Sequence, residues 1–158
     1  MRKIFPLLFI LCLATVAQAT EIKILEQIGA PLRISSYSAN YKSPARGIGD
    51  GSIVHRFVVE NIGEQDVVAY GVGIQVFDAF KRSMDLPFVG YDMSGIKVGS
   101  TQDPVWERRS LSAYLFRRYG TAVAYIDIAR FADGTIWKAN QGSISAQITD
   151  LQLEMSEE

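Results

Sequence analysis

The 158-residue sequence has one cysteine, one histidine and no excess of basic residues. Cys12 lies in an N-terminal segment that we expect to be removed, so the remaining chain can form no disulfide and must be stabilised by its core. A formal net charge of −1 at pH 7 lacks the basic character typical of nucleic-acid-binding domains. A single histidine without cysteine also disfavours a zinc site. Beyond the N-terminal segment we expect no transmembrane span.

Residues 1–19, MRKIFPLLFILCLATVAQA, are typical of a secretory signal peptide. Arg2 and Lys3 precede an apolar run from Ile4 to Val16, and Ala17-Gln18-Ala19 fits the small-residue cleavage pattern. Cleavage would remove two basic residues and take the formal net charge from −1 to −3. An uncleaved anchor is the alternative. We therefore expect an exported protein, periplasmic or extracellular, in which residues 20–158 form one domain.

Alternating apolar residues predict that most of the mature chain forms β-strands. The clearest segments are residues 53–60, with Ile53, His55, Phe57 and Val59 on one face, and residues 70–77, with Tyr70, Val72, Ile74 and Val76 on one face. Asn61 and Gly63 are the expected turn residues between them. Ile22, Ile24 and Ile28 suggest an opening strand, and residues 32–42 are polar enough for an exposed edge strand. Together these patterns predict an all-β antiparallel sandwich.

A hairpin is expected near residue 133. In residues 122–128, Ala124, Ile126 and Ile128 should face the core, and Asp133-Gly134 should turn the chain into Ile136-Trp137.

Two segments permit both helix and strand. Residues 110–119 favour a helical turn capped by Ser110 and stopped by Gly120, although a strand also fits. Residues 143–155 favour a short C-terminal helix capped by Ser143, with Ile144, Ile148, Leu151 and Met155 on one face. Because Leu151, Leu153 and Met155 alternate, a strand remains the alternative prediction for this segment.

Residues 53–137 resemble the immunoglobulin-like sandwiches of bacterial secreted proteins that carry an F-x-L-Y-D motif. The resemblance is carried by Val58-Val59-Glu60-Asn61 at a strand end, Ile74-Gln75-Val76-Phe77-Asp78 at the motif position, and the segments IKVGSTQDPVW and ARFADGTIW. Ile74, Val76 and Phe77 replace the Phe, Leu and Tyr of the motif. The resemblance implies an immunoglobulin-like β-sandwich and secretion, and it carries over no active site.

Catalytic and metal-binding patterns are weak. His55 lies mid-strand on the expected inward face, where a hydrogen-bonded core histidine is the simpler interpretation. Asp127 with Asp133, and Asp78 with Asp85, are the carboxylate pairs near turns. Asp50 and Asp133 lack the neighbouring acids that a calcium loop needs, and GIGDG precedes a strand instead of a helix that could hold phosphate. We expect no enzyme, no cofactor and no metal.

One segment suggests a binding surface. The sequence ERRSLSAYLFRRY places four arginines around apolar and aromatic residues, and tyrosine and arginine are enriched at protein-binding hot spots. The candidate binding residues are Arg108, Arg109, Tyr114, Phe116, Arg117 and Arg118. We therefore expect a secreted, non-enzymatic domain that binds another protein of the cell envelope. A carbohydrate-binding or structural envelope module is the alternative, and it would use exposed Trp106 or Trp137, which we expect to pack against the sheets instead.

Overall fold

The computed structural model describes residues 20–44 and 49–155, and it confirms an all-β sandwich with a short C-terminal helix. The predicted signal peptide, residues 1–19, lies outside the described residues. Sheet A contains β1 (Glu21–Ile24), β4 (Val67–Asp78), β5 (Phe88–Asp92), β8 (Tyr119–Phe131) and β9 (Ile136–Lys138). Sheet B contains β2 (Leu32–Lys42), β3 (Gly51–Asn61), β6 (Thr101–Gln102) and β7 (Val105–Leu111). The helices are α1 (Ala113–Arg117) and α2 (Gln141–Asp150). None of the helices in the described ranges is long and apolar enough to cross a membrane.

The strands of sheet A run in the order β1-β8-β4-β5, with β9 pairing the far half of β8. In sheet B, β2 forms one edge beside β3, and β6 and β7 pair the other side of β3. Pairing between the described strands is antiparallel except for the parallel pair β1–β8. The edge position predicted for residues 32–42 is therefore confirmed.

The main core lies between the two sheets, where the predicted alternation is confirmed. Both predicted faces are buried: Ile53, His55, Phe57 and Val59 from β3, and Tyr70, Val72, Ile74 and Val76 from β4. Burying each large apolar side chain stabilises the fold by about 1.5–3 kcal/mol. Without a disulfide, this continuous core supplies the stability of the domain.

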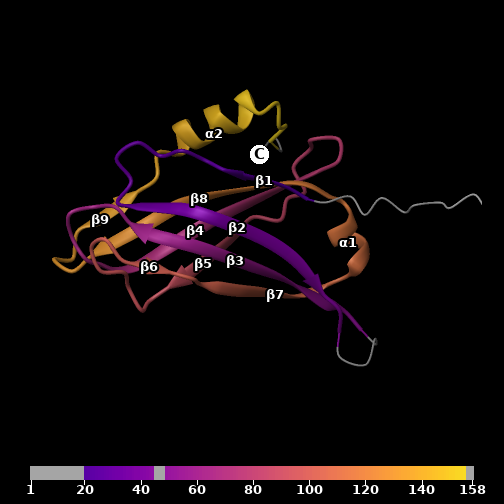
Figure 1. Cartoon of the computed structure of the whole chain (residues 1–158). Coiled ribbons are helices and arrows are strands. Elements are labelled where there is room, and N and C mark those ends of the chain that lie inside the picture. The colour runs from indigo at the N-terminus through magenta and orange to yellow at the C-terminus, as the bar shows by residue number, and fades with distance from the viewer. Residues whose placement is uncertain (1–19, 45–48, 156–158) are drawn as a thin grey trace, which may run out of the picture.

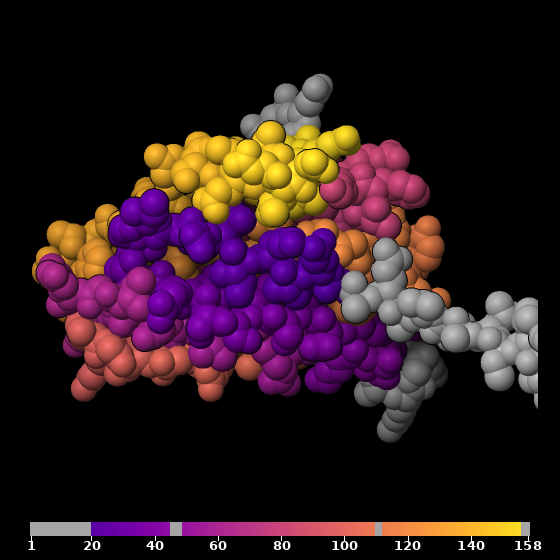
Figure 2. Space-filling view, turned by 45° about the horizontal axis from the view of Figure 1, so that its top comes forward, coloured from indigo at the N-terminus to yellow at the C-terminus, as the bar shows by residue number. Residues whose placement is uncertain are grey.

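Helix α2 covers the outer face of sheet A (Figure 1) and forms a second apolar layer with it. Helix α2 places Ile144 and Ile148 over Phe77 of β4 and over Val123 and Tyr125 of β8. Figure 2 shows α2 and the residues after it, in yellow, lying against this side of the sandwich beside the indigo β1–β2 segment. The second face of β4 is therefore also buried where α2 crosses it.

The C-terminal segment differs from the expectation in three details. The N-cap of α2 is Asn140, whose side-chain oxygen accepts a hydrogen bond from the Ser143 amide at 3.1 Å, so Ser143 is not the cap. The helix ends at Asp150, and Leu153, not Met155, is the buried residue beyond it. Leu153 is buried because the chain after the helix pairs with the β4–β5 connection, where Ser83 donates to the Glu154 carbonyl at 2.9 Å.

Strand β8 contains a bulge, and because of it the predicted inward orientation of Ile128 is wrong. Asp127 has no partner in β4, because Val72 pairs with Ile126 and Gly71 pairs with Ile128. The extra residue reverses the alternation. Ala124 and Ile126 face the main core as expected, but the half-buried Ile128 lies on the outer face and Ala129 takes the core position.

Candidate functional site

The arginine-rich segment forms one corner of the sandwich, at the end where β7 passes into β8 through α1 (Figure 1). A helical turn is confirmed, but its cap is Ser112 instead of Ser110. The Ser112 hydroxyl accepts a hydrogen bond from the Leu115 amide at 3.3 Å. The helix ends at Arg117 with Arg118 as its C-cap, before Gly120, because Tyr119 already begins β8 and is buried.

Two of the six predicted residues are used inside the fold. The Arg108 guanidinium donates to the Leu86 carbonyl at 3.0 Å, which ties β7 of sheet B to the connection preceding β5 of sheet A. Phe116 is half-buried against the main core, where it stacks on Tyr41 and packs at a tilt against Tyr119, with ring centroids 5.9 and 5.2 Å apart. Neither side chain is free to form the centre of an interface.

The other four predicted residues are exposed together, and we call them the arginine corner: Arg109, Tyr114, Arg117 and Arg118. Tyr114 is 70% exposed. Only Arg118 among them has an ion pair within the described residues, a 4.0 Å contact with Asp78. The contact is long and the Arg118 side chain is 49% exposed, so it contributes little. The arginine corner is thus a cationic, aromatic surface over a packed base.

A neighbouring carboxylate, Glu107, offsets part of this charge. Glu107 accepts a hydrogen bond from the Ser52 hydroxyl at 2.6 Å and lies 3.7 Å from Lys42. The Ser52 hydrogen bond, together with the charges of Lys42 and Arg109, holds the pKa of Glu107 below its usual value. Glu107 is therefore tied to Ser52 and Lys42, and its charge also acts on Arg109, so Arg117 and Arg118 carry most of the free positive charge of the corner.

His55 lies in the closed main core, with 1% of its surface exposed. Its Nδ1 shares a 3.0 Å hydrogen bond with the Tyr37 hydroxyl, and its ring stacks between Tyr37 and Phe88. Burial, with a smaller contribution from Arg108, lowers the pKa of His55 to about 4. The neutral, enclosed imidazole fits the core role predicted for it.

The turn carboxylates organise backbone. Asp78 accepts hydrogen bonds from the amides of Phe80 and Arg82 at 2.8 and 3.1 Å. Asp133 accepts hydrogen bonds from the amide and the hydroxyl of Thr135 at 2.8 and 2.6 Å, and these hydrogen bonds lower the pKa of Asp133. Within residues 20–44 and 49–155, no group of three or more His, Cys, Asp or Glu side chains could hold a metal ion.

The two tryptophans belong to different sheets and are both half-buried. Trp106 of β7 crosses to sheet A, where its ring lies over Gly90 of β5 and its Nε1 donates to the Tyr91 carbonyl at 3.1 Å. Trp137 of β9 packs against both apolar layers. The pair of exposed rings that would favour glycan binding is not formed by these residues.

The sequence interpretation missed a second surface, at the opposite end of the sandwich. β1 stops at Ile24, and Ile28 is fully exposed at the tip of the β1–β2 loop instead of lying in a strand. Two hollows of about 400 and 430 Å³ flank this loop. Gly29, with φ of 77°, and Pro31 follow Ile28, and this pair of turn residues was the signal that a loop begins there.

Comparisons with known proteins support the fold alone. No protein-family model matches the chain, and no curated protein sequence matches it. A crystal structure of a hypothetical protein from Peptoclostridium difficile 630 is similar in fold, with a TM-score of 0.55 and 9% sequence identity. The match covers 75% of this chain and 91% of that chain. At this identity the similarity concerns the arrangement of the strands.

Proposed function

We propose that the chain is an exported, non-enzymatic domain that binds an acidic surface of another cell-envelope protein through the arginine corner. The observation that carries the proposal is the exposure of Arg109, Tyr114 and Arg117 with Arg118 on the segment that joins β7 to β8. Arginine and tyrosine are enriched among residues that contribute most to protein binding. Positive charge would steer an acidic partner toward this corner and fix its orientation.

The packing beneath the corner supports the same proposal. Phe116 and Leu115 are half-buried against the core, and Ser112 caps α1, so the exposed residues stand on an ordered base. A preformed surface loses less conformational entropy on binding than a flexible loop. The 70% exposed ring of Tyr114 provides the apolar contact area that a purely charged surface lacks.

Affinity capture of the mature protein from its own cell envelope tests this proposal. The double variant Arg109→Glu, Arg117→Glu should lose the captured protein, and the loss should be greatest at low ionic strength. Arg56→Glu is the matched control, because Arg56 is exposed on the outer face of sheet B, away from α1. A captured protein that is retained by both variants alike would contradict the proposal.

Export is tested separately by the intact mass of the protein recovered from the envelope. Cleavage after Ala19 predicts a mass that begins at Thr20, whereas a mass that includes Cys12 would rule cleavage out. Retention on purified envelope glycan that does not depend on the arginines would instead favour the alternative, a carbohydrate-binding module.

A further inference from the structure

The loops at the end opposite α1 form a second charged surface, which we call the loop end: residues 25–31, 62–66, 93–100, 103–104 and 132–135. The strand directions bring these loops together, at the left of Figure 1, away from the arginine corner. The loop end holds five exposed acids and one exposed base: Glu26, Glu64, Asp66, Asp103, Asp133 and Lys97. The loops themselves are therefore acidic, although the exposed Arg130 and Lys138 border them on β8 and β9, and they lie at the end of the molecule opposite the cationic corner.

The loop end also exposes apolar side chains. Ile28 is fully exposed, and Ile62, Met93 and Val98 are exposed to 48%, 79% and 48%. Beside Ile28 lies a groove of about 400 Å³ whose lining is part apolar and part polar: Ile24, Leu25, Ile28, Leu32, Ile34 and Ile62, with Glu26, Gln27 and Arg33. Exposed apolar surface rimmed by charge is typical of interaction sites.

Hydrogen bonds hold the groove in shape. The Gln27 side chain both donates to the Ile126 carbonyl at 2.8 Å and accepts from the Ile126 amide at 2.7 Å, so it extends the β1–β8 pairing by one step. Gln147 of α2 donates to the Glu26 carbonyl at 2.9 Å. Ile28 is therefore presented on a fixed loop.

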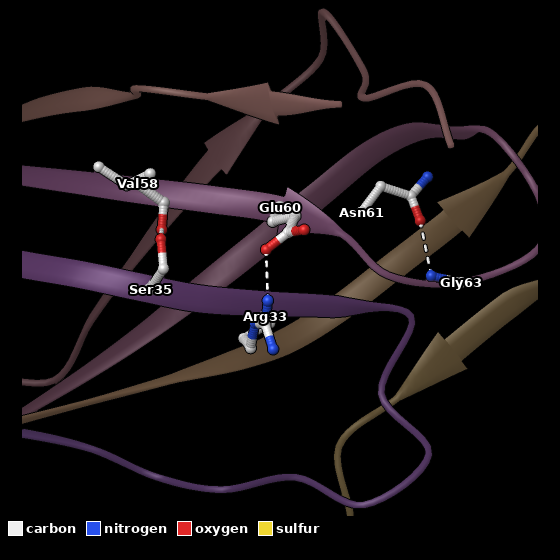
Figure 3. A network of polar contacts seen from close by, with 6 residues as sticks. All are labelled: Arg33, Ser35, Val58, Glu60, Asn61 and Gly63. Carbon is white, nitrogen blue, oxygen red and sulfur yellow. Dashed lines mark hydrogen bonds and ion pairs between the residues drawn. The ribbon is translucent and has the colours of Figure 1, made fainter. Parts of the chain in front are cut away.

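The other wall of the groove is equally ordered (Figure 3). The side-chain oxygen of buried Asn61 accepts a hydrogen bond from the Gly63 amide at 3.0 Å, as Figure 3 shows. Its side-chain nitrogen donates to the Gln65 and Ile96 carbonyls at 2.9 Å each, so the loop carrying Ile62 and Glu64 is fixed. Arg33, which also lines the groove, is paired with Glu60 at 2.6 Å. Glu60 therefore compensates the charge of Arg33, and Arg33 does not neutralise the acids of the loops.

We propose that the occupant of the groove is a second copy of this chain, which docks its arginine corner on the loop end. Charge complementarity selects this occupant: the three exposed arginines of the arginine corner meet the five exposed acids of the loop end. The contact is head-to-tail, so it generates a ring or an open chain of copies. This inference rests on the proposed function, because it uses the same arginine corner, for which a second copy and the envelope protein would compete.

The experiment is analytical ultracentrifugation of the mature protein at low and high ionic strength, from about 0.01 M to about 0.1 M or above, over which screening shortens from ~30 to ~10 Å. The wild type should form species of at least twice the monomer mass at low salt and revert to monomer at high salt. Arg109→Glu, Arg117→Glu should be monomeric at both, and so should Glu26→Lys, Glu64→Lys. An equimolar mixture of these two variants should associate again, because each retains the end that the other has lost.

Ile28→Ser tests the apolar part of the contact. Its side chain is fully exposed, so the fold should be unchanged while the proportion of the larger species falls. A wild type that is monomeric at low salt overturns the self-association, and so does a variant mixture that stays monomeric. If an arginine-dependent envelope partner is nevertheless captured, the proposed function survives that result, so the two failures are distinguishable.

Discussion

At the scale of single residues, His55 makes stability depend on pH. Burial lowers its pKa from 6.5 to about 4, so the unfolded chain binds a proton between these values that the folded chain excludes. Stability should be fully retained above pH 6.5 and fall as pH drops toward 4, by about 3 kcal/mol in total. Denaturant unfolding at a series of pH values measures this loss.

His55→Gln provides the control. The amide can still bond the Tyr37 hydroxyl, which faces Nδ1 at 3.0 Å, and it cannot titrate. The variant should be less stable overall, since it loses the stacking on Phe88, yet its stability should change less between pH 6.5 and 4. Because the chain has one histidine, an equal decline in both proteins would show that carboxylates, and not His55, cause the acid sensitivity.

Gly90 is a residue whose lack of a side chain is required. A Cβ there would clash with the Trp106 ring, which closes the side of the sandwich between β5 and β7. Gly90→Ala should therefore displace the indole, destabilise the fold by about 1–3 kcal/mol and shift the tryptophan fluorescence to the red. Trp106→Ala should lower the free energy of unfolding less in the Gly90→Ala background than in the wild type. Additive losses would mean that a side chain at position 90 does not clash with the Trp106 ring.

At the scale of elements, the β8–β9 hairpin shows which residue its turn needs. Gly134 has φ of 89° and no atom within 4 Å of a Cβ position, so a substitution there meets backbone strain without a clash. Gly134→Val should cost about 1–3 kcal/mol, whereas Gly134→Asn should cost less because asparagine tolerates positive φ. Asp133→Asn should be mild, since the amide oxygen can still accept from Thr135. Equal losses for valine and asparagine in thermal unfolding would contradict this account.

The elements also show what the sequence predicted and why the rest differed. Period-two alternation located the cores of β3, β4 and β8, because one buried face imposes that pattern. It misplaced Ile128, because a bulge at Asp127 leaves no mark in the residue types. Helix caps were misassigned to Ser110 and Ser143 in place of Ser112 and Asn140, since several polar residues there can cap equally well.

The candidate site was predicted only in part for a related reason. Composition identified the arginine segment, but it could not show that Arg108 would bond Leu86 or that Phe116 would pack against Tyr41 and Tyr119. Those contacts join segments far apart in the chain. The loop end escaped prediction because its acids and isoleucines come from separate loops that only the sheet topology brings together.

At the scale of the whole molecule, two apolar layers share sheet A, and they should differ in stability. Helix α2 has ten residues and holds its layer with buried Ile144 and Ile148, whereas β4 and β8 are packed on both faces. Because a short helix depends on its packing, we expect α2 to open in a step of lower free energy than global unfolding. Native-state hydrogen exchange should show less protected amides in α2 than in the centres of β4 and β8.

Ile148→Ala tests this arrangement directly. The substitution should cost about 2–5 kcal/mol and accelerate exchange in α2 beyond its effect on β4 and β8, if the helix opens alone before the sheets separate. Met155→Ala is the control, because Met155 is 43% exposed and should leave both exchange rates unchanged. If the amides of α2 in the wild type are as protected as those of β4, the helix and the sandwich unfold instead as one cooperative unit.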